Sequence, residues 1–600
     1  MRVRAFLLLL VAACGLTACG GSHGSGPVPQ IGAGPESSSA KARAAALPRI
    51  ATAGKRATDA IAVSRRRAQS GTTAPNVTIA DMPVPRPDTA PCVVPLFTGF
   101  TFSDFSPHAF AYTPPAACRP PWAKVVLEAD LSITAGVQYD RTATIGLGGA
   151  TIFFGTTSEP SSTAARKWHV ERDLTELSAL FTESQTGQIT IGNIVNSTYT
   201  GVLGASGELE FYPPDRRYPA PRVADVVVPL ADSNGNPVAL DTTSSQLTKS
   251  FVPPANVEGA ELQVISQSQI GDEFWYTCFP NDLATLLDNC GNTAFRETEI
   301  AVDGKPAGAA PVYPWIYTGG IDPFLWFPIP GVQTLDFVPY RVDLSPFAGT
   351  LDDGATHEVA ISVYNADDYF SVQGNLLLFL DHGARGRLSG ALDEDSLAAA
   401  PVESVREGGA GFNASGIGSG TIDTTSKRAY VITGHVLTSH GLVANVAQQT
   451  LSFTQHQNIV SSATGFAQSI TQNTIALSTS SGHGGGVAYT RSDQFAWPLS
   501  LSYSYAVNAD GTSAQTTQVR QSYGVLSEGS GDGRPALWAE TNTVAPSDTL
   551  KFDASGNFTG NANNASSQLF TYFDSSGTCY GKLVKETNGS VTANAPVGCR

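Results

Sequence analysis

The chain has 600 residues, of which 15% are charged, and its formal net charge is −16. One hydrophobic core does not grow to that size, so we expect roughly two to four domains. Ser, Thr, Gly, Asn and Pro supply most of the remaining polar residues, which is typical of loop-rich β proteins rather than helical enzymes. The acidic balance, without any folded-looking stretch rich in Lys and Arg, argues against nucleic acids and anionic membrane surfaces as partners.

The N-terminus has the pattern of an export signal. Arg2 and Arg4 precede an apolar run, residues 5–13, that is far shorter than the roughly 20 residues needed to cross a bilayer. Residues 16–19, Leu-Thr-Ala-Cys, resemble a bacterial lipobox, which implies cleavage before Cys19 and a lipid on that cysteine. The alternative is an ordinary secretory signal peptide. Both predict an exported bacterial protein in the outer membrane, the periplasm or at the cell surface, and the lipid would be its only membrane contact.

Six further cysteines fall into three pairs that are close in the sequence. Sequence alone leaves several pairings open, but local pairing in an oxidising compartment is the simplest. The predicted disulfides are Cys92 with Cys118, Cys278 with Cys290, and Cys579 with Cys599. No Cys-x-x-Cys or His-x-x-x-His spacing occurs, so we predict structural disulfides and neither zinc nor another cofactor.

Strand patterns dominate the rest of the chain. Residues 123–131 and 208–212 are apolar or alternating runs bounded by turn residues, and the short helix predicted at residues 282–287 is an exception. We therefore predict an all-β protein with two adjacent jelly-roll or β-sandwich domains and a third, β-rich C-terminal domain. The expected division is a signal peptide (1–19), a flexible linker (20–84), a first jelly roll (85–229), a second (230–385), a charged linker (386–428) and a C-terminal β domain (429–600).

The stretch 297–326 is the most informative in composition. It begins as a strand, turns at Asp303-Gly304, restarts as a strand and then becomes an aromatic loop around Gly319-Gly320. Glycine lets other groups approach the backbone closely, and the aromatic rings offer flat apolar faces. Two interpretations stay open: a sugar-binding cleft, or an aromatic plug that seals one end of a sandwich.

Many short motifs occur together in residues 91–382. They include Tyr139-Asp140-Arg141, Leu147-Gly148-Gly149, Ser158-Glu159-Pro160, Asp272-Glu273-Phe274-Trp275-Tyr276, Phe295-Arg296-Glu297, Thr318-Gly319-Gly320-Ile321, Asp343-Leu344-Ser345-Pro346-Phe347 and Leu351-Asp352-Asp353-Gly354. In this order they resemble the peptide-N-glycosidase A type of glycoamidase.

The resemblance implies hydrolysis of the amide that links asparagine to the innermost N-acetylglucosamine of an N-glycan. Aspartate stays in the peptide, and the glycan leaves as a glycosylamine. It also implies two adjacent eight-stranded jelly rolls with the site at their interface, and N-glycosylated peptides and proteins as partners. The catalytic positions that it points to are Asp140, Arg141 and Glu273.

The residues themselves suit this chemistry. Amide hydrolysis needs a base to activate water and donors or a cation to hold the oxyanion, and Asp140 beside Arg141 supplies both kinds of group. Adjacent residues of a strand point to opposite faces, so the pair serves one site only at a strand end or bulge. The alternative is a solvated turn. Glu273 lies among aromatic residues, which raise a carboxyl pKa and favour a proton donor; the alternative there is an ordinary strand.

Five further residues are predicted to contact the sugar: Glu159, Trp168, Trp275, Trp315 and Asp322. Two other functions remain open for the same pattern, a non-catalytic carbohydrate-binding lipoprotein and a glycoside hydrolase with paired carboxylates.

Overall fold

A computed structural model describes residues 76–485, 487–531 and 536–598. Most of these residues lie in antiparallel strands, and the helices in the described segments are short. They are η1 (Thr175–Phe181), η2 (Ile270–Asp272), η3 (Trp275–Thr277), α4 (Asn281–Leu287), η4 (Pro323–Trp326), η5 (Ser345–Phe347) and α5 (Ala348–Leu351). No helix of the described chain is both long and apolar enough to span a bilayer.

The first unit is an eight-stranded jelly roll made of two four-stranded sheets. One sheet runs in the order β1 (Cys92–Phe102), β8 (Leu203–Tyr212), β3 (Lys124–Ile133), β6 (Arg166–Asp173), and the other β2 (His108–Tyr112), β7 (Gln185–Ile191), β4 (Thr142–Leu147), β5 (Ala150–Thr156). The two inner faces enclose one apolar core, as expected for packed sheets. The sandwich predicted here is confirmed.

The second unit repeats the same strand order. Its sheets are β10 (Val238–Leu240), β17 (Phe370–Leu380), β12 (Val257–Ser268), β15 (Tyr340–Asp343), with β9 (Val226–Leu230) also on β17, and β11 (Leu247–Phe251), β16 (His357–Tyr364), β13 (Glu297–Val302), β14 (Lys305–Pro311). Because β9 pairs with β17, the second unit begins before residue 230, the predicted boundary. The helix predicted at residues 282–287 is confirmed as α4.

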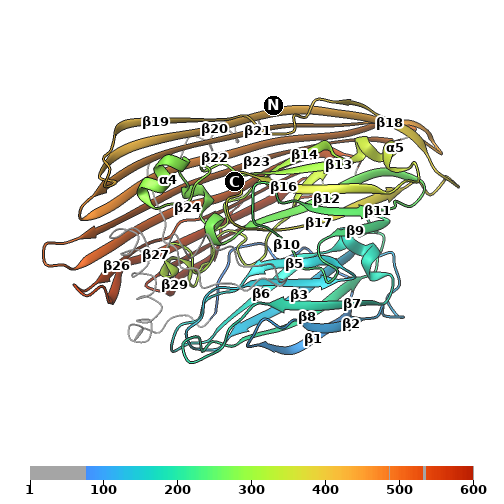
Figure 1. Ribbon diagram of the computed structural model, residues 1–600. Helices are drawn as coiled ribbons and strands as arrows, with labels where there is room; N and C mark the ends of the chain where they lie inside the picture. The colour runs from blue at the N-terminus through green and yellow to red at the C-terminus, as the bar shows by residue number, and fades with distance from the viewer. Residues whose placement is uncertain (1–75, 486, 532–535, 599–600) are drawn as a thin grey trace.

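The third unit is a single twelve-stranded sheet whose longest hairpins run the length of the molecule (Figure 1). Its strands are β18 (Ser389–Asp395), β19 (Glu403–Phe412), β20 (Gly418–Thr438), β21 (Gly441–Ser462), β22 (Gly465–Gly484), β23 (Val487–Val507), β24 (Ser513–Ser530), β25 (Leu537–Val544), β26 (Ser547–Phe552), β27 (Phe558–Asp574), β28 (Cys579–Thr587) and β29 (Ser590–Pro596). We refer to it as the C-terminal sheet.

The linker predicted at residues 386–428 is wrong, because β18, β19 and half of β20 occupy it. Strand β19 is exposed along almost its whole length and carries charges and glycines, as edge strands often do, so its sequence lacks the apolar alternation of a covered strand. The C-terminal sheet therefore starts at Ser389 rather than at residue 429.

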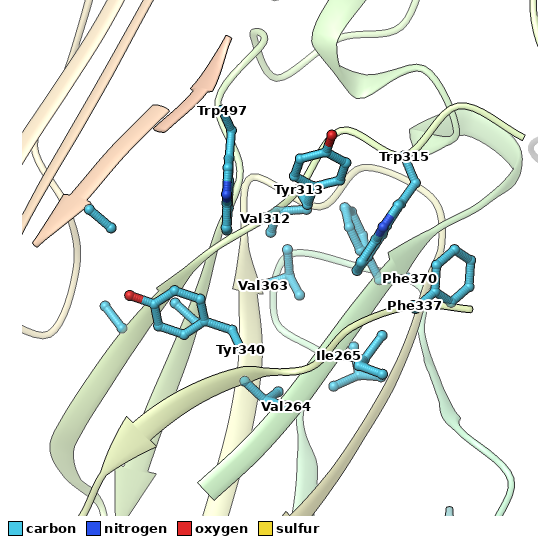
Figure 2. Packing of buried hydrophobic residues seen from close by; sticks show 14 of the residues in the cluster. Val264, Ile265, Val312, Tyr313, Trp315, Phe337, Tyr340, Val363, Phe370 and Trp497 are labelled. Atoms are coloured by element: carbon cyan, nitrogen blue, oxygen red, sulfur yellow. The ribbon is translucent and has the colours of Figure 1, made fainter. Parts of the chain in front are cut away.

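The C-terminal sheet packs on the second jelly roll and shares its core. Figure 2 shows this contact, where Trp497 from β23 faces Tyr313 and Tyr340 of the jelly roll. The Tyr313 and Trp497 ring centroids are 5.2 Å apart with the rings edge to face. The Trp315 and Phe337 ring centroids are 4.5 Å apart with the rings tilted. Aromatic pairs in this geometry bury large apolar areas. The aromatic loop therefore seals an interface between two units.

The end of the predicted flexible linker contacts the folded units, and the rest of that prediction, residues 20–75, lies outside the described residues. Residues 76–84, here called the N-terminal strap, contact all three units. The Val77 amide donates to the Lys167 carbonyl of the first jelly roll at 3.0 Å, and the Thr78 amide to the Pro328 carbonyl of the second at 2.9 Å. The Lys582 ammonium of the C-terminal sheet donates to the Ile79 carbonyl at 2.8 Å.

Candidate active site

Two acidic residues of the first jelly roll lie at the same end of one hairpin. Asp140 and Arg141 come directly before β4, and Glu159 comes shortly after β5, which is antiparallel to β4. The start of one strand and the end of its antiparallel neighbour meet at one edge of the sheet. The Arg141 carbonyl accepts from the Thr157 amide at 2.8 Å, which extends the pairing beyond the regular strands. Asp140 and Arg141 therefore lie at a strand end, which is the position that allows both side chains to serve one site.

The second jelly roll approaches these carboxylates through a glycine. A Cβ placed on Gly319 would lie 2.4 Å from an Asp140 oxygen and 2.5 Å from a Glu159 oxygen. Both carboxylates therefore surround one point of the backbone, which only glycine can occupy without moving them. The adjacent Thr318 hydroxyl donates to the Thr157 carbonyl at 2.8 Å, joining the two units beside the carboxylates.

Glu273 is the third carboxyl group of this site and comes from the second jelly roll. Burial, followed by the negative charges of Asp140 and Glu159, raises the pKa of Glu273 well above its ordinary value. A buried carboxyl beside two like charges keeps its proton at higher pH, because ionisation would add a third charge in a poorly solvated place. The site thus contains the carboxyl groups of Asp140 and Glu159 and, in Glu273, a third carboxyl group whose raised pKa suits a proton donor.

A buried ion pair fixes the segment that carries Glu273. Asp272 and Arg296 are fully buried, and one Asp272 oxygen accepts from the guanidinium at 2.8 and 3.0 Å. The other oxygen accepts from the backbone amides of Asp367, Asp368 and Tyr369 at 2.8, 2.9 and 3.2 Å. The alternative of an ordinary strand here is wrong, because the segment forms two 3₁₀ turns, η2 and η3, around this anchor.

Arg141 balances the charge of the site from the first jelly roll. Its guanidinium is buried and donates to the Gln138 side-chain oxygen at 2.6 Å. Burial lowers the pKa of Arg141, and the charge of Asp140 and, more weakly, that of Glu159 oppose this change. Because a guanidinium stays protonated in proteins, it stabilises negative charge at the two carboxylates.

An aromatic pair beside Arg141 was not predicted from the sequence. The rings of Tyr139 and Tyr199 are both partly exposed, and their centroids are 5.3 Å apart. The Arg141 guanidinium carbon lies 6.0 Å from the centre of the Tyr139 ring. Tyr139 precedes Asp140, so the sequence held a signal for it, whereas Tyr199 comes from a loop about sixty residues away that only the fold brings close.

The three tryptophans predicted to bind sugar lie in hydrophobic cores. Trp168 is 5% exposed in the core of the first jelly roll, and Trp275 and Trp315 are 1% and 4% exposed in the core shared with the C-terminal sheet. Buried rings offer no face to a sugar, so this arrangement does not support the predicted contacts. Figure 2 shows Trp315 pointing into that core. The aromatic-plug interpretation is the one that the structure supports.

Asp322 is also buried and has a structural contact. Its side chain caps η4 by accepting from the Phe324 amide at 2.9 Å. It also hydrogen-bonds with Asp548 of the C-terminal sheet. These contacts join η4 to the C-terminal sheet, and they do not support the predicted contact of Asp322 with the sugar.

Two predicted disulfides are confirmed. Cys92 is bonded to Cys118 and Cys278 to Cys290, with Cα atoms 6.1 and 4.7 Å apart. Cys579 is disulfide-bonded as well, and its predicted partner, Cys599, lies outside the described residues, as does Cys19. The Cys278–Cys290 bridge closes the segment directly after Glu273, so it limits the motion of that part of the site.

Among the described residues, one group of metal-type ligands occurs, on strands β3 and β6 of the first jelly roll. Oxygen and nitrogen atoms of Glu128, His169 and Glu171 lie within 4.8 Å of one another. Arg86 forms ion pairs with both glutamates, so their charge is already used in a protein network. The group therefore has a structural explanation in side-chain ion pairs.

Fold and site together define a class: an all-β protein of two jelly rolls with an acidic site where they meet. The family model described as peptide N-acetyl-beta-D-glucosaminyl asparaginase amidase A matches residues 83–394. The chain is 30% identical over 415 residues to the Prunus dulcis protein named peptide-N4-(N-acetyl-beta-glucosaminyl)asparagine amidase A, covering 66% of this chain and 71% of that protein. The chain therefore belongs to the peptide N-acetyl-beta-D-glucosaminyl asparaginase amidase A family.

Among solved structures, the chain is similar to PNGF-II, with a TM-score of 0.32 and 14% identity over 49% of this chain and 66% of that one. It is also similar to recombinant peptide:N-glycanase F, with a TM-score of 0.32 and 13% identity over 48% of this chain and 96% of that one.

Proposed function

We propose that this protein hydrolyses the amide bond between asparagine and the innermost N-acetylglucosamine of N-glycans on peptides and proteins. Membership of the amidase family supports the reaction. The observation that carries the assignment of the site is that side-chain oxygens of Asp140 and Glu159 both lie next to Gly319. The negative charges of these two residues also raise the pKa of Glu273.

In the proposed mechanism, Asp140 acts as general base. It takes a proton from water as the water oxygen attacks the carbonyl carbon of the asparagine side chain. Glu273, whose pKa is raised by burial and by the two neighbouring negative charges, donates its own proton to the amide nitrogen as the carbon–nitrogen bond breaks. The products are aspartate in the peptide and a glycosylamine. Arg141 offsets the negative charge of the carboxylates and of the oxyanion, and Glu159 orients the sugar amide.

Product mass tests this function against its alternatives. A defined N-glycopeptide incubated with the protein in heavy-oxygen water should yield an aspartyl peptide that carries the label, because the new carboxyl oxygen comes from water. A bound but unchanged glycopeptide would instead support a carbohydrate-binding protein. Cleavage between two sugars would support a glycoside hydrolase.

Asp140→Asn tests the assigned base. Asparagine keeps the shape of the side chain but cannot accept the proton, so kcat should fall by about a hundredfold to ten-thousandfold. Circular dichroism and the unfolding midpoint should stay as in the wild type. Activity near the wild-type level would move the base to another residue, and Glu159 is the next candidate.

We also propose that the protein is exported and anchored by a lipid on Cys19. The disulfides Cys92–Cys118 and Cys278–Cys290 support an oxidising compartment. Cell fractionation of a Cys19→Ser variant tests the anchor, since the variant should move from the membrane to the soluble fraction. Membrane association that persists in the variant would contradict it.

A further inference from the structure

The buried face of the C-terminal sheet carries glutamines where it meets the two site loops of the second jelly roll. The side chains of Gln455 and Gln457 on β21, Gln468 on β22, and Gln515 and Gln521 on β24 are at most 3% exposed. A buried side-chain amide without hydrogen-bond partners destabilises the folded state. These five buried amides therefore require hydrogen-bond partners, and the hydrogen bonds show which groups those partners are.

Three of these amides bind consecutive backbone carbonyls in the segment after Glu273. The Gln455 amide nitrogen donates to the carbonyl of residue 276 at 2.8 Å, that of Gln468 to residue 277 at 3.1 Å, and that of Gln457 to residue 278 at 3.0 Å. Carbonyls of an irregular segment have no strand partner and need donors from elsewhere. The sheet supplies one donor to each of the three carbonyls, and the carbonyl of residue 277 also accepts from the Asn289 side-chain nitrogen at 3.1 Å.

The same glutamines also bind one another. The Gln457 amide nitrogen donates to the Gln455 oxygen at 2.7 Å, and the Gln468 nitrogen donates to the Gln457 oxygen at 2.7 Å. The Gln455 nitrogen donates to the Gln472 oxygen at 2.8 Å. Each of the three amides thus has its nitrogen and oxygen ends assigned by its neighbours, so the chain of amides presents a fixed row of donors.

A second set holds the loop that contains Gly319. The Gln521 nitrogen donates to the Pro314 carbonyl at 2.6 Å, and its oxygen accepts from the Val332 amide at 3.0 Å. The Gln515 nitrogen donates to the Ile321 carbonyl at 3.3 Å. The two loop carbonyls lie on either side of Gly319, so the sheet fixes the backbone at both ends of the contact with the carboxylates.

We propose that the C-terminal sheet positions the active site through these amides, holding Glu273 and Gly319 against the carboxylates of the first jelly roll. Residues 455–521 all lie beyond the span 83–394 that defines the family match. On one side of Glu273 stands the Asp272 ion pair and on the other the row of glutamines, so the acid is held from both directions. This inference rests on the proposed function, because it assigns positioning residues to that reaction.

Gln455→Met tests the proposal, because methionine is similar in size and donates no hydrogen bond. We expect kcat for a defined glycopeptide to fall about tenfold with KM changed less than about twofold, as for a misplaced catalytic group. The alkaline limb of the pH profile should move to lower pH, since a looser loop admits water and favours ionised Glu273. Gln468→Met should act in the same direction and serves if Gln455→Met does not fold.

Gln449→Met is the matched control. Gln449 is buried on the same strand, but it binds the Tyr340 hydroxyl at 2.8 Å and the Ser478 hydroxyl at 2.9 Å, away from the site loops. It should lower stability to a similar extent and leave kcat and the pH profile unchanged. A wild-type kcat and pH profile in folded Gln455→Met, or an equal loss in Gln449→Met, would overturn the proposal.

Hydrogen exchange of the peptide that covers residues 270–279 separates this proposal from the proposed function, because it needs no substrate. Gln455→Met should exchange faster than wild type in that peptide, and Gln449→Met should not. If the wild-type protein yields no aspartyl peptide, the proposed function fails, and the exchange result alone decides whether the amides order the loop. Equal exchange in all three proteins would overturn the positioning role.

Discussion

Gly319 is the residue at which the site tolerates the least change. A methyl group there would meet oxygens of both Asp140 and Glu159 at distances that real Cβ atoms do not adopt. These oxygens end flexible side chains, so the fold can adjust by turning them away. Gly319→Ala should therefore leave the unfolding midpoint nearly unchanged and lower kcat about a hundredfold, because a small misplacement of catalytic groups has a large effect on rate.

Gly386→Ala provides the control for that substitution. Gly386 is exposed, and a Cβ there would meet nothing within 4 Å. Its kcat should equal the wild-type value in the same glycopeptide assay. Full activity in Gly319→Ala would show that the two carboxylates need not occupy the positions seen here.

Glu273 predicts how activity depends on pH. Its pKa is raised, so the proton-donating form is present below that pKa and is lost as the pH rises through it. The kcat/KM profile should therefore have an alkaline limb, and Glu273→Gln should show low activity without that limb. Glu159→Gln removes one of the charges that raise the pKa, so its limb should lie at lower pH. An alkaline limb at the wild-type position in all three proteins would contradict this role.

At the scale of elements, the turns η2 and η3 depend on the buried pair of Asp272 and Arg296. Asp272→Asn leaves the guanidinium without its counter-charge in a dry place, which costs about 3–5 kcal/mol when a buried pair is broken. Urea unfolding should show this loss. Asp88→Asn removes the exposed partner of Arg217 and should have almost no effect, as for surface pairs. Similar losses in both variants would contradict the anchor role.

The sequence predicted most strands of the jelly rolls because they alternate or run apolar between turn residues. The sequence-based prediction was wrong where the residues that pack on a segment are far away in the sequence. Trp315 has the composition of a sugar-binding residue, but residues in the shared core, among them Trp497 nearly two hundred positions later, enclose that loop. Strand β19 has no covered face and so gave no alternation.

The acidic site was predictable only in part, for a related reason. Asp140, Arg141 and Glu273 were found through short motifs, and the prediction included Glu159 as a sugar contact. Nothing local shows that Gly319 lies between Asp140 and Glu159, since the contact joins two jelly rolls. The role of Gln455 was equally hidden, because a polar residue on a strand usually faces solvent.

At the scale of the molecule, the N-terminal strap places Asp81 near Glu540 of the C-terminal sheet. Burial raises the pKa of Asp81 to about 6, although Asn542 and Gln568 donate to it. Burial and the charge of Asp81 raise the pKa of Glu540 to about 8. The folded protein therefore holds protons that the unfolded chain has lost, so this contribution to stability disappears as the pH rises.

The Glu540→Gln variant tests that contribution. Between pH 4.5, the ordinary pKa of a glutamate, and about 8, the wild-type melting temperature should fall, because the unfolded chain loses the Glu540 proton that the folded protein still holds. The variant has no such proton to lose, so its melting temperature should fall less over that range. Glu394→Gln, at an exposed position, should follow the wild type. A fall in Glu540→Gln equal to that of the wild type would contradict the prediction.

The strap also has a consequence for when the molecule is complete. Ala80 and the Gln568 side chain that binds it are 488 positions apart, and Ile79 and Lys582 are 503 apart. Each doubling of a closed loop adds only about 0.6 kcal/mol, so this separation hardly weakens the finished contact. The large sequence separation instead delays formation of the contact during folding, because contacts between distant parts of a chain form late. A newly made chain therefore lacks the contacts of Ile79 and Ala80, and leaves this part of the strap more open to proteases, until β27 and β28 have been synthesised.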